Sequence, residues 1–199
     1  AVAVVGAAVF AIAPLLPDIA QEFGVSVAKA SLLLAAYSGS VAITAPLTGL
    51  TAQRLPRATV IVAGLVLYAA AWLAALLVTR FDGMVIVAAL AGAASGAVLP
   101  ATYAYAGDLS SFENRGRVMG YIVSGWSLSI LLVAPAMAAT AQLVNWRYVF
   151  AGLAVAAIVT AVGLALARKP PTPPLPDTGR SFWHDIFVSL KVVATHRGT

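Results

Sequence analysis

The chain has 199 residues, of which 61% are apolar and only 10% are charged. A soluble domain carries roughly 25% charged residues, so the composition excludes an ordinary water-soluble fold and indicates that lipid surrounds most of the chain. The sequence contains no cysteine, which excludes a disulfide framework and a cysteine-based metal site. The formal net charge of +5 comes from basic residues between apolar runs, so membrane topology explains it better than nucleic-acid binding.

Six apolar runs without a charged residue approach or exceed the roughly 20 residues that a helix needs to cross a bilayer. They cover residues 1–16, 30–51, 58–79, 84–107, 118–143 and 148–167. The chain starts inside the first run, and we interpret that run as a span cut short at its beginning. Runs rich in alanine and leucine, without polar alternation, favour helices over barrel strands. The sequence therefore predicts an all-α membrane protein with six transmembrane helices.

The basic residues are divided unequally between the two sides that six spans define. One side has Lys29, Arg80 and Arg147, and the other has Arg54, Arg57, Arg115, Arg117, Arg168, Lys169, Arg180, Lys191 and Arg197. Cytoplasmic loops of membrane proteins are the ones enriched in lysine and arginine. We therefore expect a multi-pass protein of the plasma membrane (the bacterial inner membrane) whose N-terminus and 168–199 segment are both cytoplasmic.

Residues 168–199 follow the last span and differ from it in composition. Prolines cluster at 170–176, which predicts a stiff extended linker. Six apolar side chains then recur at helical spacing, namely Phe182, Trp183, Ile186, Phe187, Leu190 and Val193. They predict an amphipathic helix at the cytoplasmic membrane face, with a disordered tail as the alternative.

Two segments of the chain resemble each other at a constant offset. Residues 45–53 read APLTGLTAQ and residues 134–142 read APAMAATAQ, so Ala-Pro and Thr-Ala-Gln occupy equivalent places. The two segments are three spans apart, and an odd number of crossings inverts the second copy. Inverted three-helix repeats are an architecture of secondary transporters. We therefore divide the bundle at 1–167 into two inverted repeats, 1–79 and 84–167, followed by the 168–199 segment.

Three further motifs lie where spans end or begin. Residues 14–20 read PLLPDIA, residues 115–120 read RGRVMG, and residues 145–150 read NWRYVF. In these motifs the chain resembles the major facilitator superfamily, and within it the branch of drug–proton antiporters and sugar-efflux proteins. The resemblance implies the N-terminal six-helix half of a twelve-helix transporter, whose partner is the missing C-terminal six-helix half.

The loop after the second span carries part of that family's cytoplasmic gate motif. Gly49, Arg54 and Arg57 match the family pattern, while Gln53 stands where an aspartate is usual. The resemblance implies that these four residues form the gate and that the uncharged Gln53 makes a weaker latch. The arginine that the family often has in its fourth span is Ala88 here.

Polar and aromatic residues within the apolar runs are the candidates for a solute cavity. They are Tyr37, Ser40 and Thr44 in the second span, Ser95, Thr102 and Tyr103 in the fourth, and Ser124 and Trp126 in the fifth. Spans three and six are almost free of polar residues, so we expect them to face lipid while the other four surround the cavity. Each hydroxyl has an alternative role in a hydrogen bond to its own helix backbone, and each ring could instead pack between helices.

Small residues and prolines indicate where the helices bend and pack. Pro46, Pro100 and Pro135 lie inside spans, where a proline removes a backbone hydrogen bond and bends the helix. Such bends would help a cavity to open and close, although a span also tolerates proline without that role. Gly92 and Gly96 form a small-residue pair that predicts a close contact between two helices.

The spans contain no charged residue, so this half supplies no evident proton carrier at membrane depth. Asp18 and Asp108 are the candidates near the ends of spans. We expect Asp18 to be an exposed loop carboxylate, and Asp108 to pair with Arg115 or Arg117.

Together these features predict a secondary transporter that works by alternating access. The family resemblance favours proton-coupled efflux of a small, partly hydrophobic solute, either drug-like or sugar-like. The alternative is a membrane scaffold derived from a transporter. Gln53 and Ala88 lack the charges that the family usually has at these positions, as expected of a gate that is no longer under selection. We expect no cofactor, metal or enzymatic activity, because both histidines, His184 and His196, lie in the 168–199 segment, away from the spans.

Overall fold

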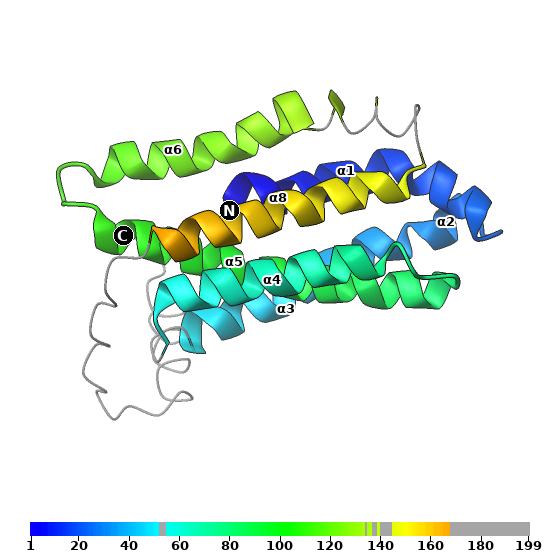
Figure 1. The fold of residues 1–199 in the computed structure, drawn as a ribbon, viewed down its shortest axis with the longest axis horizontal. Coiled ribbons are helices and arrows are strands. Elements are labelled where there is room, and N and C mark those ends of the chain that lie inside the picture. The colour runs from blue at the N-terminus through cyan, green and yellow to red at the C-terminus, as the bar shows by residue number, and fades with distance from the viewer. Residues whose placement is uncertain (52–54, 134, 137–138, 140–144, 168–199) are drawn as a thin grey trace, which may run out of the picture.

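The computed structural model describes residues 1–51, 55–133, 135–136, 139 and 145–167. Within these ranges the chain is helical and has no strand, so the predicted all-α fold is confirmed (Figure 1). The elements are α1 (Val2–Glu22), α2 (Val27–Ala30), α3 (Leu32–Thr51), α4 (Arg57–Ala74), α5 (Phe81–Leu109), α6 (Arg115–Leu128), the π-helical turn η1 (Ser129–Val133) and α8 (Arg147–Leu166).

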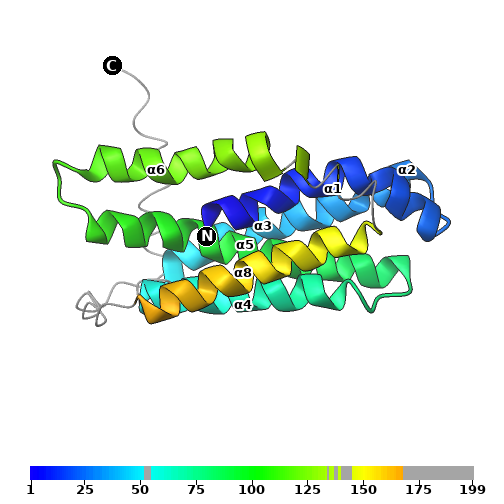
Figure 2. The same ribbon diagram turned by 45° about the horizontal axis from the view of Figure 1, so that its top comes forward.

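The long helices lie roughly side by side along the long dimension of the molecule (Figures 1 and 2). α5 packs against both α3 and α4, and α4 also packs on α8. α1 contacts α6, η1 and α8, so it joins the early helices to the late ones. In both views α6 runs along the outside of the bundle next to α1.

Among the described residues, five helical segments are long and apolar enough to cross a membrane. They are Val2–Glu22, Val27–Gly49, Arg57–Ala74, Phe81–Leu109 and Arg147–Leu166. These correspond to the predicted spans one, two, three, four and six. The predicted fifth span, 118–143, corresponds to α6 and η1 over its described part, and most of its remainder lies outside the described residues.

The first helix is longer than the sequence predicted. We expected it to end at residue 16, but α1 continues to Glu22 with Pro14 and Pro17 inside it. A proline keeps a helical φ and removes only one hydrogen bond, which a spanning helix tolerates. Asp18 is therefore exposed, as predicted, but on a helix rather than in a loop. The turn comes at Gly24, whose φ of 62° lies in the left-handed region that favours glycine.

Of the other three span prolines, two lie inside continuous helices and one adjoins irregular backbone. Pro46 lies inside α3 and Pro100 inside α5. Pro135 follows the π-helical turn η1, and its missing N–H explains why regular α-helical bonding fails there. That these prolines allow the cavity to open and close stays a prediction.

α3 and α5 approach closely at two glycines of α5. A Cβ atom at Gly92 would lie 2.2 Å from the backbone oxygen of Tyr37, and one at Gly96 would lie 2.5 Å from Oγ1 of Thr44. Any larger residue would collide at these places, so the close contact predicted for this glycine pair is confirmed. The approach brings Tyr37 of α3 beside Ser95 of α5.

Several predictions fall outside the described residues. They concern Gln53 and Arg54 of the gate motif, and the linker and amphipathic helix at 168–199. The division into two inverted repeats also stays a prediction.

Candidate functional site

A cavity of about 120 Å³ opens between α1, α3, α5 and α6. Its lining consists of Val5, Val9, Tyr37, Ser38, Val41, Ser95, Leu99 and Trp126. None of these side chains is charged, and most are apolar. The first, second, fourth and fifth predicted spans each contribute at least one residue to it.

A pair of hydroxyls forms the polar centre of the cavity wall. The hydroxyl oxygens of Tyr37 and Ser95 are 2.6 Å apart, and each residue is 1% exposed. The Tyr37 hydroxyl also lies 3.1 Å from the carbonyl oxygen of Val5, and the Ser95 hydroxyl lies 2.9 Å from that of Ala91. Two hydroxyl protons thus serve three contacts, so the pair can reverse its direction of donation, and in either direction it offers an acceptor lone pair to a polar group.

Trp126 closes the cavity on the α6 side. Its ring meets Phe10 of α1 edge to face, with centroids 6.3 Å apart and an interplanar angle of 88°. It also lies against Gly6, where an added Cβ atom would be 3.1 Å from the indole ring. The absence of a side chain at Gly6 therefore leaves room for this ring beside α1.

The structure brings together three of the eight predicted cavity residues, Tyr37, Ser95 and Trp126. The other five, Ser40, Thr44, Thr102, Tyr103 and Ser124, do not line this cavity. Thr44, Thr102 and Ser124 donate instead to carbonyl oxygens four residues earlier in their own helices. Within the described ranges, no three acidic or histidine side chains gather closely enough to hold a metal ion.

At the start of α4, Arg57 forms an ion pair with Asp108 of α5, and the nitrogen and oxygen are 2.9 Å apart. The predicted pairing of Asp108 with Arg115 or Arg117 is therefore wrong. α5 continues to Leu109, so Asp108 lies in its last turn beside the packed α4, while the two arginines belong to the next helix. Arg115 instead directs Nη2 at the carbonyl oxygen of Gly107, 3.5 Å away, and Arg117 is exposed.

The described part of the gate motif consists of Gly49 and Arg57. Gly49 lies near the end of α3, and an added Cβ atom would meet nothing within 4 Å. Arg57 is the first residue of α4. The ion pair with Asp108 thus fastens the start of α4 to the end of α5 at the face that we predict to be cytoplasmic.

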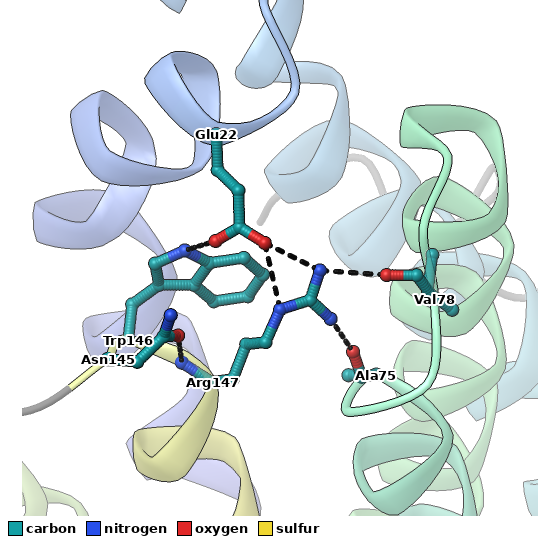
Figure 3. A network of polar contacts seen from close by, with 6 residues as sticks. All are labelled: Glu22, Ala75, Val78, Asn145, Trp146 and Arg147. Atoms are coloured by element: carbon teal, nitrogen blue, oxygen red, sulfur yellow. Dashed lines mark hydrogen bonds and ion pairs between the residues drawn. The ribbon is translucent and has the colours of Figure 1, made fainter.

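A second polar network lies at the opposite end of α4 (Figure 3). Nε and Nη2 of Arg147 donate to Oε1 of Glu22 over 3.0 and 2.8 Å. Nη2 also donates to the carbonyl oxygen of Val78 over 2.7 Å, and Nη1 donates to that of Ala75. The indole Nε1 of Trp146 donates to the other oxygen of Glu22 over 2.6 Å. We call these five residues the Arg147 clamp, and it joins the ends of α1 and α4 to the start of α8.

Sequence reasoning missed the Arg147 clamp. Arg147 was counted as a loop charge for topology and as part of the motif at 145–150, and Glu22 was given no role. A signal was present, because tryptophan and arginine adjoin at the start of the last span, where an arginine can stack on the ring while it binds a carboxylate. The partners, however, are separated from Arg147 by 125, 72 and 69 positions, which no local pattern reveals.

Comparison with known proteins identifies the family. The family model of the Major Facilitator Superfamily matches residues 1–197. The chain belongs to this superfamily. Membership confirms the resemblance that its motifs indicated, and together with the five spanning segments it makes the chain part of an integral multi-pass membrane protein.

Relatives of this superfamily member are found among curated bacterial proteins. It is 33% identical to the uncharacterised MFS-type transporter YwfA of Bacillus subtilis (strain 168) over 139 residues, which are 70% of this chain and 34% of the relative. It is 28% identical to a chloramphenicol resistance protein of Streptomyces lividans over 167 residues, 84% of this chain and 43% of the relative. It is 27% identical to multidrug resistance protein 2 of Bacillus subtilis over 121 residues, 61% of this chain and 30% of the relative. The chain thus spans less than half the length of these relatives.

Proposed function

We propose that this chain is half of a secondary active transporter that exports a small, partly hydrophobic solute by alternating access in the bacterial inner membrane. The observation that carries the proposal is the cavity between α1, α3, α5 and α6. Its walls come from both predicted repeats, so a small movement of one helix set against the other would change its shape and its access.

The lining favours a solute without a permanent charge. Valine, leucine and tryptophan side chains supply most of the surface, and no lining residue offers a charge to balance one on the solute. The Tyr37–Ser95 pair supplies one adaptable polar contact. The volume of about 120 Å³ is below the roughly 300–1,000 Å³ of typical ligand pockets, which fits a site completed by the C-terminal six-helix half.

Two relatives support a drug-like solute ahead of a sugar-like one. One is named as a chloramphenicol resistance protein and the other as a multidrug resistance protein. Coupling to protons is also part of the proposal. The cavity lining contains no carboxylate, histidine or lysine, so the proton carrier lies outside it, and the C-terminal half is its expected place.

The test is an efflux assay on bacterial cells that express the native protein carrying this chain. Radiolabelled chloramphenicol is loaded, and the retained label is followed with and without a protonophore. We expect expressing cells to retain less chloramphenicol, and the difference to vanish when the proton gradient collapses. Efflux that persists after collapse would remove the proton coupling, and equal retention in expressing and empty cells would favour the scaffold.

Two variants test whether the cavity carries the solute. Ser38→Trp places a large ring in the cavity, while Val159→Trp adds the same ring to α8 at a residue that is 66% exposed. We expect Ser38→Trp to abolish efflux at normal protein levels, and Val159→Trp to leave it intact. Equal efflux by both variants would contradict this cavity as the solute site.

A further inference from the structure

The Arg147 clamp is a helix cap supplied by another helix. α4 ends at Ala74, so the carbonyl groups that follow have no partner within the helix. Arg147 donates to two of them, those of Ala75 and Val78, while Glu22 balances its charge. One guanidinium therefore fixes the end of α4, the end of α1 and the start of α8 relative to one another.

Four aromatic rings continue from the clamp into the middle of the bundle. The guanidinium carbon of Arg147 lies 4.8 Å from the centre of the Trp146 ring. The ring centres are then separated by 5.8 Å from Trp146 to Phe150, by 4.3 Å from Phe150 to Trp72, and by 6.4 Å from Trp72 to Tyr37. Phe150 and Trp72 are stacked, with an interplanar angle of 9°. We call Trp146, Phe150, Trp72 and Tyr37 the aromatic column.

The aromatic column has little freedom to absorb a displacement. Phe150 and Trp72 are 0% exposed, Tyr37 is 1% exposed and Trp146 is 4% exposed. Close-packed interiors transmit strain because their side chains have few alternative positions. The column ends at the hydroxyl that contacts Ser95 in the cavity wall. The aromatic column thus forms a continuous packed path from the Arg147 clamp to Tyr37.

We propose that Arg147 is a positioning residue for the cavity: through the aromatic column it holds the Tyr37 hydroxyl beside that of Ser95, so that the contact between the two predicted repeats sets the shape of the solute site. That this site receives a solute rests on the proposed function. The coupling from Arg147 to Tyr37 is a property of the fold and is measurable without any transport.

The chain contains no cysteine, so a single introduced thiol can report on the cavity wall. Ser95→Cys places the thiol at a residue that is 1% exposed and in contact with the Tyr37 hydroxyl. The native protein with this change is held in membrane vesicles and treated with N-ethylmaleimide. Mass spectrometry of the peptide around position 95 then gives the labelling rate. Ala101→Cys, also 1% exposed and further along α5, reports on general loosening.

Arg147→Lys is the test variant, because lysine keeps the charge but cannot bind a carboxylate and two carbonyls as a planar fork. Arg80→Lys is its matched control, since the Arg80–Asp82 pair has both side chains largely exposed at 85% and 78%. We expect Arg147→Lys to raise the labelling rate of Ser95→Cys on the order of threefold to tenfold. Arg80→Lys should leave that rate unchanged, and neither variant should change the rate of Ala101→Cys.

Phe150→Leu tests whether the coupling from Arg147 to Tyr37 runs through the aromatic column, because it interrupts the column while Arg147 and Glu22 remain. It should raise the labelling of Ser95→Cys as Arg147→Lys does. An unchanged rate at position 95 in either variant would overturn the proposal, and so would an equal rise at positions 95 and 101, which would mean a loosened fold. If the native protein exports no solute, the proposed function fails, but the labelling rates still decide whether Arg147 positions Tyr37.

Discussion

At the scale of single residues, hydroxyl groups fasten the start of α1 to its neighbours. Three successive carbonyl oxygens of α1 accept hydroxyls from other elements. The pairs are Ser129 with Ala3 at 2.8 Å, Tyr68 with Val4 at 3.2 Å, and Tyr37 with Val5 at 3.1 Å. A carbonyl in a helix has a second lone pair, so it can accept such a bond in addition to its helical one. The hydroxyls are thereby satisfied in a medium without water.

Tyr37→Phe should cost little stability, although Tyr37 is buried. The change removes the hydroxyl but keeps the ring stacked near Trp72. Hydrogen bonds between membrane helices contribute about 0.6 kcal/mol on average, and we expect a loss of that size in an unfolding titration in mixed micelles. Tyr37→Ala also removes the ring and should cost about 3–5 kcal/mol. A similar loss for both variants would mean that the hydroxyl, rather than the packed ring, holds Tyr37 in place.

The residue scale is also where prediction from the sequence reached its limit. Tyr37 and Ser95 were predictable, because hydroxyls are exceptions within otherwise apolar spans. It was not predictable which hydroxyls donate to a carbonyl oxygen of their own helix, since the partner depends on side-chain rotamers and on the neighbouring helix. Thr44 and Thr102 both donate to a carbonyl oxygen of their own helix. The role of Arg147 was hidden for a different reason, because two of its partners are backbone carbonyl groups, which a sequence does not distinguish.

At the scale of helices, lengths and positions followed from apolar runs, because the bilayer sets a minimum span. Four of the five spanning segments found in the structure begin and end near the predicted boundaries, and α1 was the exception. Its apolar run without charge stopped before Pro17 and Asp18, but a helix in lipid keeps its backbone bonded wherever it can. Contacts between helices were predictable only where small residues recur, as at Gly92 and Gly96.

Gly92→Ala should destabilise the contact between α3 and α5. The new Cβ atom would lie 2.2 Å from the Tyr37 carbonyl oxygen, so two helix backbones would have to separate. Overpacking of this kind costs about 1–3 kcal/mol. Gly152→Ala in α8 is the matched control, because its Cβ atom would meet nothing within 4 Å. Unfolding of both variants in detergent measures the difference, and equal stability of the two would contradict the close approach.

At the scale of the whole molecule, two ion pairs hold opposite ends of α4 and differ in whether the arginine also binds backbone carbonyl oxygens. Arg57 is a cation at the N-terminus of α4, and Asp108 is an anion in the last turn of α5. Both positions oppose the dipole, which favours anions at N-termini and cations at C-termini. Arg147 at the N-terminus of α8 and Glu22 at the C-terminus of α1 oppose their own helix dipoles as well, but Arg147 also binds the Ala75 and Val78 carbonyl oxygens that follow α4.

Exchanging the charges should therefore have opposite results at the two ends. In the double variant Arg57→Asp with Asp108→Arg, the ion pair is kept and each charge now suits its helix end, so stability should equal or exceed that of the wild type by about 0.3–1 kcal/mol. In the double variant Glu22→Arg with Arg147→Glu, the new charges also suit the ends of α1 and α8, a gain of about 0.3–1 kcal/mol. A carboxylate would, however, face the Ala75 and Val78 carbonyls, so their hydrogen bonds would be lost at a larger cost of about 1–3 kcal/mol. Each double variant is compared with its two single variants by unfolding in mixed micelles. Recovery of wild-type stability by the second exchange would show that Glu22 and Arg147 form a simple ion pair, and that the backbone of α4 does not need the guanidinium.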